Sequence, residues 1–261
     1  MAFGAPLNAP IRDWRGRRVW LVGASTGIGA ALARRLAEQG AQLALSARSR
    51  NKLETLAAQC PGALALPMDV TQPQDYPRVR EQILALWGGI DFVVLNAGTY
   101  APLRAWELTP DALRATLDTN LLGVMDGVAA TVAQLLEQGS GALAIVGSVA
   151  GYGGLPRAAV YGPSKAALIN LAESLYLDLA PRGISVFLVS PGFVATPLTA
   201  QNDFRMPALI QPEDAADAII AGFARGDFEI HFPRRFSYAM KCLRLLPYRL
   251  YFPLIRRVTG L

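Results

Sequence analysis

The chain has 261 residues, of which 52% are hydrophobic and 17% charged; this composition predicts a folded chain with a sizeable core and excludes intrinsic disorder. No uninterrupted apolar run reaches the roughly 20 residues that a membrane-spanning helix needs. The net charge of +5 is uneven: residues 232–261 hold seven basic side chains and no acid, which leaves residues 1–231 with 18 basic and 20 acidic ones, a balance untypical of a nucleic-acid-binding protein.

The chain before residue 232 alternates between apolar runs of strand type and segments with helical periodicity. Strands are predicted at Arg18–Val22, Gln42–Ser46, Ala63–Leu66, Asp91–Leu95, Ala142–Gly147, Ile184–Ser190 and Phe228–Phe232. Helices are predicted at Ile28–Gln39, Lys52–Gln59, Asp75–Trp87, Pro110–Glu137, Val160–Leu179 and Pro212–Arg225. This alternation predicts an α/β fold, with one doubly wound parallel sheet of seven strands and helices on both faces. We expect one catalytic domain over residues 1–231, with its cofactor half at about 15–135 and its substrate half at about 136–231, followed by a basic, aromatic tail.

The first strand-to-helix turn is rich in glycine. It reads Gly23-Ala24-Ser25-Thr26-Gly27-Ile28-Gly29, with the three glycines spaced Gly-x-x-x-Gly-x-Gly. Glycines at this place let the backbone turn sharply and approach a pyrophosphate, which the N–H groups at the helix N-terminus can bind. The turn therefore predicts a dinucleotide site, although a glycine turn with only a packing role is the alternative interpretation.

The end of the second predicted strand bears on the choice of cofactor. A site selective for NAD places an acid there, which hydrogen-bonds the ribose 2′-hydroxyl. This chain has Ala47 instead, followed by Arg48, whose guanidinium can bind a 2′-phosphate bidentately. We predict NADP(H) in preference to NAD(H), with Ser46 or Arg50 as a further contact; alternatively, the two arginines only solvate a loop.

A phenol and an amine lie one helical turn apart at Tyr161 and Lys165. A neighbouring ammonium favours the phenolate and so lowers the tyrosine pKa towards the working pH, as a general acid or base requires. Ser148 follows a predicted strand at the carboxyl edge, where open α/β sheets bind ligands, and its hydroxyl could hydrogen-bond a substrate oxygen. An ordinary helix face and a loop cap are the alternative interpretations.

Together these residues resemble the short-chain dehydrogenase/reductase family, in its short, one-domain form. The resemblance covers about residues 15–230 and rests on the order and spacing of the glycine turn, Asn96-Ala97-Gly98, Asn120, Ser148, Tyr161, Lys165 and Pro191-Gly192. It implies a Rossmann fold with strand order 3-2-1-4-5-6-7 and a nicotinamide cofactor. Val22 stands where many members have threonine, for which we expect only a small loss of hydrogen bonding between strands.

The resemblance also implies a role for each matching residue. Tyr161 would exchange a proton with the substrate oxygen, Lys165 would lower the tyrosine pKa and hold the nicotinamide ribose, and Ser148 would polarise the carbonyl. Asn120, within the long predicted helix, would anchor a water of the proton relay. The implied cofactor contacts are Gly23, Ser25, Thr26, Gly27, Ile28, Gly29, Arg48, Asp69, Val70, Asn96, Ala97, Gly98, Tyr161, Lys165, Pro191, Gly192, Val194 and Thr196.

The substrate is predicted only by class. The segment 196–212 should form a wall or lid over it, and this segment is rich in apolar residues. We expect Tyr152, Leu155 and Pro156, after Ser148, to face the same cavity. An apolar lining favours a lipophilic ketone or alcohol. The predicted function is thus an NADP(H)-dependent oxidoreductase acting on a small-molecule carbonyl or alcohol; a catalytically silent, cofactor-binding regulatory or scaffold protein is the alternative.

The tail admits two interpretations. Residues 232–261 interleave basic with aromatic and aliphatic side chains, a pattern found in helices that lie on anionic membranes. It also fits a tail that packs on the domain or on another subunit, and we expect Pro247 and Pro253 to divide it into short helical pieces. The resemblance implies a homodimer or homotetramer, formed through the long helices around 110–137 and 158–180.

The remaining inferences concern compartment and metals. Cys60 and Cys242 are too few for a disulfide framework, and residues 1–16 lack the apolar stretch of a signal peptide, so a reducing cytoplasm is expected, with contact to the inner face of a membrane if the tail binds lipid. The single histidine, His231, argues against a triad built on histidine and against a site with several histidine ligands. We expect no metal.

Overall fold

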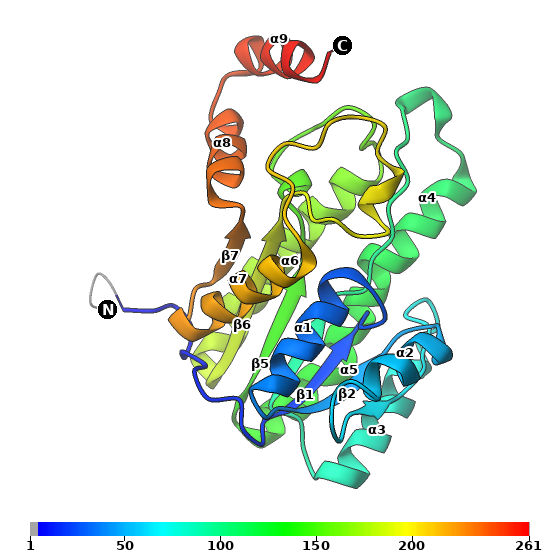
Figure 1. The fold of residues 1–261 in the computed structure, drawn as a ribbon. Coiled ribbons are helices and arrows are strands. Elements are labelled where there is room, and N and C mark those ends of the chain that lie inside the picture. Colours follow the sequence, from blue (N-terminus) through cyan, green and yellow to red (C-terminus); the bar gives the residue numbers. More distant parts are fainter. Residues whose placement is uncertain (1–4, 261) are drawn as a thin grey trace.

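Seven parallel strands form one sheet, in the order β3-β2-β1-β4-β5-β6-β7, in a computed structural model that describes residues 5–260 (Figure 1). The strands are β1 (Arg18–Val22), β2 (Gln42–Ser46), β3 (Leu64–Ala65), β4 (Phe92–Leu95), β5 (Gly141–Val146), β6 (Ile184–Pro191) and β7 (Glu229–Phe232). Every residue of β1 from Val19 onward, and all of β4 and β6, is buried. Strands that are apolar throughout are typical of a parallel sheet with both faces covered.

Helices cover the two faces of the sheet. They are α1 (Gly27–Glu38), α2 (Arg50–Ala57), α3 (Asp75–Trp87), α4 (Pro110–Leu117), α5 (Gly123–Gln138), α6 (Tyr161–Leu179) and α7 (Pro212–Arg225), with α8 (Arg234–Arg244) and α9 (Tyr248–Thr259) in the tail. Buried side chains of α1, α2 and α7 share one apolar core with the sheet, and those of α3, α5 and α6 share the other. The doubly wound fold and its predicted strand order are therefore confirmed.

The predicted elements are found with small shifts at their ends, but two predictions about helices are wrong. The helix predicted at Pro110–Glu137 is interrupted by a π-helical turn at Asp118–Leu122, which separates α4 from α5. The apolar periodicity runs through this turn, because one extra residue widens the helix locally without ending it.

Pro253 does not divide the tail as expected, because it lies inside α9; only Pro247 separates the two tail helices. Proline in a helix removes one donor and crowds the carbonyl one turn earlier. Pro253 is exposed, so water can hydrogen-bond the carbonyl oxygen that its missing N–H would have served.

The stretch Pro110–Gln138 is, within the described residues, the one helical segment with the length and apolarity of a membrane span, at a mean hydropathy of 1.2. It contains Asp111, Arg114, Asp118 and Asp126 and packs against the sheet through one side, with Val124 and Val128 in the core. Its exposed side carries Leu122 and Met125. We interpret it as a core helix with a partly apolar outer face.

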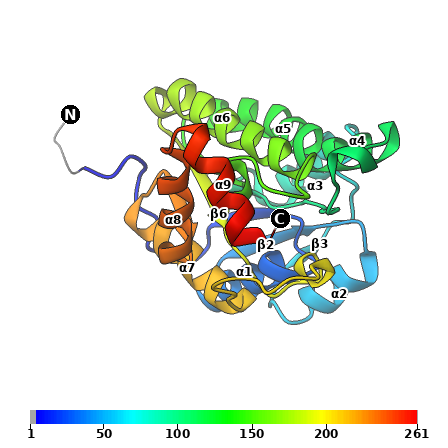
Figure 2. The ribbon, with the colours of Figure 1, turned by 90° about the horizontal axis from the view of Figure 1, so that it is seen from above.

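The two tail helices rise from the carboxyl end of β7 (Figure 1), and in the view from above α9 crosses over the carboxyl ends of the strands (Figure 2). Met240 of α8 and Tyr251 and Ile255 of α9 are buried. The Tyr251 hydroxyl donates a hydrogen bond of 2.7 Å to the carbonyl oxygen of Gly154, in the loop after Ser148. The tail therefore packs on the same end of the sheet as the predicted site. Leu261 lies outside the described residues, as does the beginning of the 1–16 stretch, up to residue 4.

Candidate active site

The glycine turn lies in close contact with the end of β4. Gly23 has φ +85°, and a Cβ atom there would stand 2.5 Å from the backbone nitrogen of Ala97. At Gly29 a Cβ atom would stand 2.2 Å from the carbonyl oxygen of Gly23. Neither position has room for a side chain, so the turn and the strand end pack backbone against backbone. Asn96 secures this contact by donating from Nδ2 to the Gly23 carbonyl oxygen at 2.8 Å.

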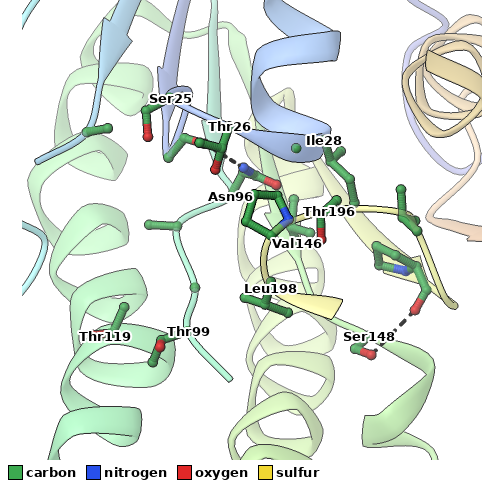
Figure 3. A pocket seen from close by; sticks show the side chains of 18 of the residues that line it. Ser25, Thr26, Ile28, Asn96, Thr99, Thr119, Val146, Ser148, Thr196 and Leu198 are labelled. Atoms are coloured by element: carbon green, nitrogen blue, oxygen red, sulfur yellow. Dashed lines mark hydrogen bonds between the residues drawn. The ribbon is translucent and has the colours of Figure 1, made fainter. Parts of the chain in front are cut away.

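The N-terminus of α1 is accessible to solvent. Thr26 is the residue before the helix, and its side chain forms no capping hydrogen bond. The first N–H groups of this twelve-residue helix are therefore free to bind an anion, and the helix dipole adds to the attraction. Ser25, Thr26 and Ile28 border a cleft at this point (Figure 3). These features fit the pyrophosphate of a dinucleotide.

The cleft has a volume of about 420 Å³ and runs along the carboxyl ends of the central strands. It collects most residues that the sequence assigned to the site: Gly23, Ser25, Thr26, Gly27, Ile28, Arg48, Val70, Asn96, Ala97, Gly98, Ser148, Tyr161, Lys165, Pro191, Gly192, Val194 and Thr196. In open α/β sheets, ligands bind at the carboxyl ends of the strands, where the strand order reverses. In this sheet the order reverses between β1 and β4.

Tyr161 and Lys165 lie on the first turns of α6 and face the cleft. The Lys165 Nζ atom is 5.7 Å from the centroid of the Tyr161 ring and donates a hydrogen bond of 3.0 Å to the Val146 carbonyl oxygen. A Cβ atom built on Gly98 would stand 3.7 Å from the same Nζ atom. Gly98 therefore lies directly beside the ammonium in the cleft.

Ser148 lines the same cleft, just after the end of β5 (Figure 3). Its Oγ atom accepts a hydrogen bond from the backbone N–H of Ala150 at 3.1 Å and donates one of 3.4 Å to the carbonyl oxygen of Pro191. The side chain therefore caps the short helical turn that follows, as the alternative interpretation has it, and it also borders the cleft. The two roles coexist.

The titration of the pair differs from the expected pattern. Burial raises the pKa of Tyr161 to about 12, and the nearby hydroxyl of Ser148 opposes that rise. Burial also lowers the pKa of Lys165 to about 8. The pKa of Tyr161 is therefore not lowered as expected, because desolvation penalises the charged forms of both the phenol and the amine. At neutral pH the phenol is protonated and ready to donate.

Asn120 is fully buried in the π-helical turn and does not line the cleft. Its Oδ1 atom accepts from the Thr99 N–H at 2.7 Å, and its Nδ2 atom donates to the Thr99 carbonyl oxygen at 2.8 Å. The side chain therefore fixes the segment after β4. The apolar periodicity of the sequence does not predict this π-helical turn, which shifts the register of the helix at Asn120.

Two predicted cofactor contacts also lie outside the cleft. Gly29 serves the close packing of α1 against the glycine turn and is buried. Asp69 directs Oδ1 to the backbone N–H and the hydroxyl of Thr71, at 3.0 and 2.9 Å, so its carboxylate orders the turn before α3. Met68 and Val70, on either side of Asp69, are the residues that line the cleft there.

The cleft ends beside the basic residues that follow β2. Arg48 and Lys52 both line it, together with Ala47 and Ser49, and both basic side chains are exposed. The sequence analysis did not predict Lys52. This residue reaches the cleft because α2 begins immediately after the loop.

Two further contacts expected at this end are not available. Ser46 is fully buried, and its Oγ atom accepts a hydrogen bond of 3.0 Å from the indole N–H of Trp20. Arg50 forms an ion pair with Glu54 on the outer side of α2, at 3.6 Å, and does not line the cleft.

The substrate side of the cleft is apolar and aromatic. The Tyr100 ring packs edge-on against the Tyr161 ring, with centroids 5.0 Å apart. Leu198 of the segment 196–212 lines the cleft, and Phe204 of the same segment packs on Phe193 at 5.7 Å. An ion pair of 2.6 Å between Arg157 and Asp203 joins this segment to the loop after β5.

Tyr152 points elsewhere than expected. Its hydroxyl donates to the carboxylate of Glu229 on β7, and Lys241 of α8 lies 5.5 Å above its ring. It therefore belongs to the contact with the tail and does not line the cleft. Other cleft residues that the sequence analysis did not name are Thr99, Thr119, Val146, Gly147, Pro197 and Thr199. Within residues 5–260, no group of three or more His, Cys, Asp or Glu side chains is arranged to hold a metal ion.

Known proteins of similar sequence and structure agree on one family. A family model described as short chain dehydrogenase matches residues 17–206. An uncharacterized oxidoreductase of Myxococcus xanthus is 36% identical over 249 residues, which cover 93% of this chain and 97% of that protein. One of Staphylococcus epidermidis is 33% identical over 201 residues, covering 77% of this chain and 87% of that protein.

Two solved structures extend the comparison. A short-chain type dehydrogenase/reductase of Mycobacterium marinum is 30% identical, with a TM-score of 0.76 over 84% of this chain and 95% of that one. A short chain dehydrogenase/reductase of Burkholderia phymatum, solved in complex with NAD, shares the fold at 22% identity, with a TM-score of 0.81 over 88% of this chain and 94% of that one. The chain belongs to the short-chain dehydrogenase/reductase family of NAD(P)-dependent oxidoreductases.

Proposed function

We propose that the protein is an NADP(H)-dependent oxidoreductase that interconverts a carbonyl and an alcohol of a lipophilic substrate, with Tyr161 as general acid and base. The observation that carries this proposal is one continuous cleft, which extends from the uncapped N-terminus of α1 to Tyr161, Lys165 and Ser148. When bound, the nicotinamide supplies or accepts the hydride. A protein that only bound the cofactor would have no use for a proton donor at this end.

The three polar side chains divide the work at the substrate oxygen. The protonated phenol of Tyr161 donates its proton during reduction and takes one back during oxidation, as positioned acid–base groups do. Ser148 offers a hydroxyl to the same oxygen and holds it in line. Lys165 is mostly protonated at neutral pH, since its pKa is about 8, so its ammonium stabilises any negative charge that develops on the phenol oxygen.

The basic end of the cleft supports a preference for NADP(H). Arg48 and Lys52 project from the loop and the helix after β2, with Ala47 where an NAD-selective site has an acid. Neither Arg48 nor Lys52 forms an ion pair with any residue of the described chain. Both charges are therefore available to a 2′-phosphate, and no carboxylate at position 47 repels it.

The substrate end supports a lipophilic ketone or alcohol. Leu198 lines the cleft there, the Tyr100 ring contacts Tyr161, and Phe204, which packs on Phe193, remains 47% exposed. Asp203, next to Phe204 in the chain, is paired with Arg157 at 2.6 Å. A sugar or a phosphorylated substrate would find few free hydrogen-bonding partners in this part of the cleft.

Assembly is a further part of the proposal. Leu122 of the π-helical turn and Met125 and Leu136 of α5 are exposed, and α6 exposes Leu177 at 73%. Apolar residues on two adjacent helices support a homodimer or homotetramer that joins through α5 and α6. Cys60 and Cys242 are both free, as is usual in the reducing cytoplasm, where we place the protein.

A substrate panel tests the proposed reaction. Ketones and alcohols of increasing chain length are assayed through the nicotinamide absorbance, once with NADPH or NADP⁺ and once with NADH or NAD⁺. We expect turnover that rises with substrate hydrophobicity and a higher kcat/KM with the phosphorylated cofactor. Tight NADPH binding without turnover on any member of the panel would favour the silent, cofactor-binding alternative.

A further inference from the structure

The tail formed by α8 and α9 is strongly cationic and largely uncompensated. Lys241 pairs with Glu229 at 2.5 Å, but the other basic side chains form no ion pair with residues 5–260. These exposed residues are Arg234, Arg235, Arg244, Arg249, Arg256 and Arg257. No Asp or Glu follows Glu229 in the chain. The tail thus presents six free positive charges at one end of a body whose own charges nearly cancel.

The same tail leaves much of its apolar surface uncovered. In α9 the apolar side chains recur at helical spacing, yet only Tyr251 and Ile255 are buried, at 5% and 7% exposure. The domain therefore covers only the centre of a wide apolar face. The large apolar residues left exposed on α9 and in the turn before it are Leu245 at 84%, Tyr248 at 60%, Leu250 at 59%, Phe252 at 55%, Leu254 at 38% and Val258 at 72%.

Cations and apolar residues occupy different sides of α9. At 100° per residue, Phe252, Ile255 and Val258 follow one another within one broad sector. Arg249, Arg256 and Arg257 fall together in a separate basic sector of about 100°, which begins roughly 40° beyond Phe252. The helix is therefore amphipathic, with a basic side and an apolar side that is broader than its contact with the domain.

The orientation of this surface is fixed by contacts with the active-site loops. The Tyr251 hydroxyl meets Gly154 at 2.7 Å, and a Cβ atom on Gly153 would stand 2.8 Å from that hydroxyl, so α9 packs closely on the loop after Ser148. On α8, Phe236 packs against Phe193, with centroids 5.5 Å apart. The tail consequently lies over the carboxyl end of the sheet (Figure 2), the end whose loops and strand ends line the cleft.

We propose that α8 and α9 form a docking surface for a bilayer that contains anionic phospholipid. Basic residues beside exposed aromatic and aliphatic ones are what an interfacial helix uses: the apolar face enters the boundary between headgroups and acyl chains while the cations meet lipid phosphates. The occupant of this surface is the bilayer, because two copies joined tail to tail would bring two sets of six unpaired cations together.

Docking in this orientation turns the end of the molecule that carries the cleft towards the membrane. A lipophilic substrate could then pass between the bilayer and the active site with little exposure to water. This last step rests on the proposed function, whereas the docking itself does not.

Vesicle flotation of the full-length protein tests the docking. The probes are vesicles of phosphatidylglycerol mixed with phosphatidylcholine and vesicles of phosphatidylcholine alone, each at low and at high sodium chloride concentration. Two variants address the two sides of α9: Phe252→Ser/Val258→Ser removes exposed apolar groups, and Arg256→Gln/Arg257→Gln removes charge. Leu86→Ser and Arg182→Gln, at exposed sites outside the tail, are the matched controls.

We expect the wild type and both controls to float with the anionic vesicles only, and salt to weaken the binding. The arginine variant should bind roughly tenfold to thirtyfold more weakly, the size that two lost surface cations imply. The apolar variant should also lose binding, while NADPH binding stays at the wild-type level in every variant.

Three results would overturn the docking proposal: no flotation of the wild type, equal flotation with neutral vesicles, or equal losses in the tail variants and the controls. Light scattering in the absence of vesicles tests whether a second copy of the chain occupies the surface instead. A tail variant that changed the oligomeric state there would assign the surface to a second copy. Because the readout is lipid binding, a failure here leaves the proposed reaction untouched, and an inactive protein that floats leaves the docking standing.

Discussion

The ammonium of Lys165 donates a 3.0 Å hydrogen bond to the carbonyl oxygen of Val146, the last residue of β5. This bond ties the catalytic helix α6 to the strand whose end carries Ser148. It also keeps a charge in a place where its side chain is almost completely buried, at 4% exposure. The cost of that burial is visible in the pKa of Lys165, which is lowered from 10.5 to about 8.

Replacement of this lysine by Lys165→Met should make the stability of the protein depend on pH in a defined way. Below pH 8 the lysine is protonated in both the folded and the unfolded chain, and its burial costs roughly 3 kcal/mol. Between pH 8 and 10.5 the folded protein releases the proton while the unfolded chain keeps it, so the wild type gains stability as pH rises.

The difference in unfolding free energy between Lys165→Met and wild type should therefore favour the variant most at pH 7 and shrink by pH 10. Urea denaturation at several pH values measures it, with the exposed Lys52→Met variant as control. A difference that stays constant with pH would show that the ammonium bears no desolvation cost. The variant should lose turnover at every pH, since it lacks the ammonium at the active site.

The cofactor preference should depend on Arg48 and Lys52. Arg48→Ala or Lys52→Ala removes one charge-assisted contact to a 2′-phosphate, worth about 1.5–3 kcal/mol, so the ratio of kcat/KM for NADPH to that for NADH should fall roughly tenfold to a hundredfold. Steady-state kinetics with both cofactors give the ratio.

Arg50→Ala is the matched control for these two variants, because Arg50 pairs with Glu54 and lies outside the cleft. Its ratio should equal that of the wild type. If Arg50→Ala lowered the ratio as much as Arg48→Ala does, general charge near the loop would explain the preference and the assigned contacts would be wrong.

The close contact between the glycine turn and β4 should make Gly23 irreplaceable. In Gly23→Ala the new Cβ atom meets the Ala97 backbone at 2.5 Å in addition to the strain of a left-handed conformation, so both the thermal midpoint and NADPH affinity should fall steeply.

Gly88→Ala separates the two causes. Gly88 also has a positive φ, +69°, but a Cβ atom there meets nothing within 4 Å. This variant should lose only the roughly 1–2 kcal/mol of backbone strain and keep its cofactor affinity. Equal losses in the two glycine variants, measured by thermal denaturation and NADPH titration, would contradict the packing argument.

The features that the sequence predicts well are those set by local pattern. The glycine turn, the Tyr161–Lys165 spacing and the strand ends fall within a few neighbouring residues, and parallel topology then brings the strand ends to one edge. The relation between α1, β1 and β4 follows from the same alternation of strand and helix. For this reason most of the predicted site residues line one cleft.

The predictions that fail depend on long-range packing. Tyr152 points to Glu229 because β7 and α8, much later in the chain, supply a carboxylate and an ammonium beside it. Burial tends to raise the pKa of that carboxylate, but the hydrogen bonds from Lys241 and Tyr152 hold it below its ordinary value. Asn120 is buried in a π-helical turn and is hydrogen-bonded to Thr99, and Ser46 accepts a hydrogen bond from Trp20. None of these partners is visible in a local window of sequence.

The account as a whole depends on the proton that Tyr161 carries, and one comparison tests it most directly. Tyr161→Phe and Tyr100→Phe each remove a hydroxyl from one of two rings in edge-on contact, 5.0 Å apart. Turnover and NADPH affinity are measured for both variants on a substrate that the wild type converts. We predict that Tyr161→Phe binds NADPH normally but loses a factor of about 10²–10⁴ or more in kcat, while Tyr100→Phe retains most of its activity. Turnover by Tyr161→Phe at the wild-type rate would contradict the assignment of this phenol as the acid and base of the reaction.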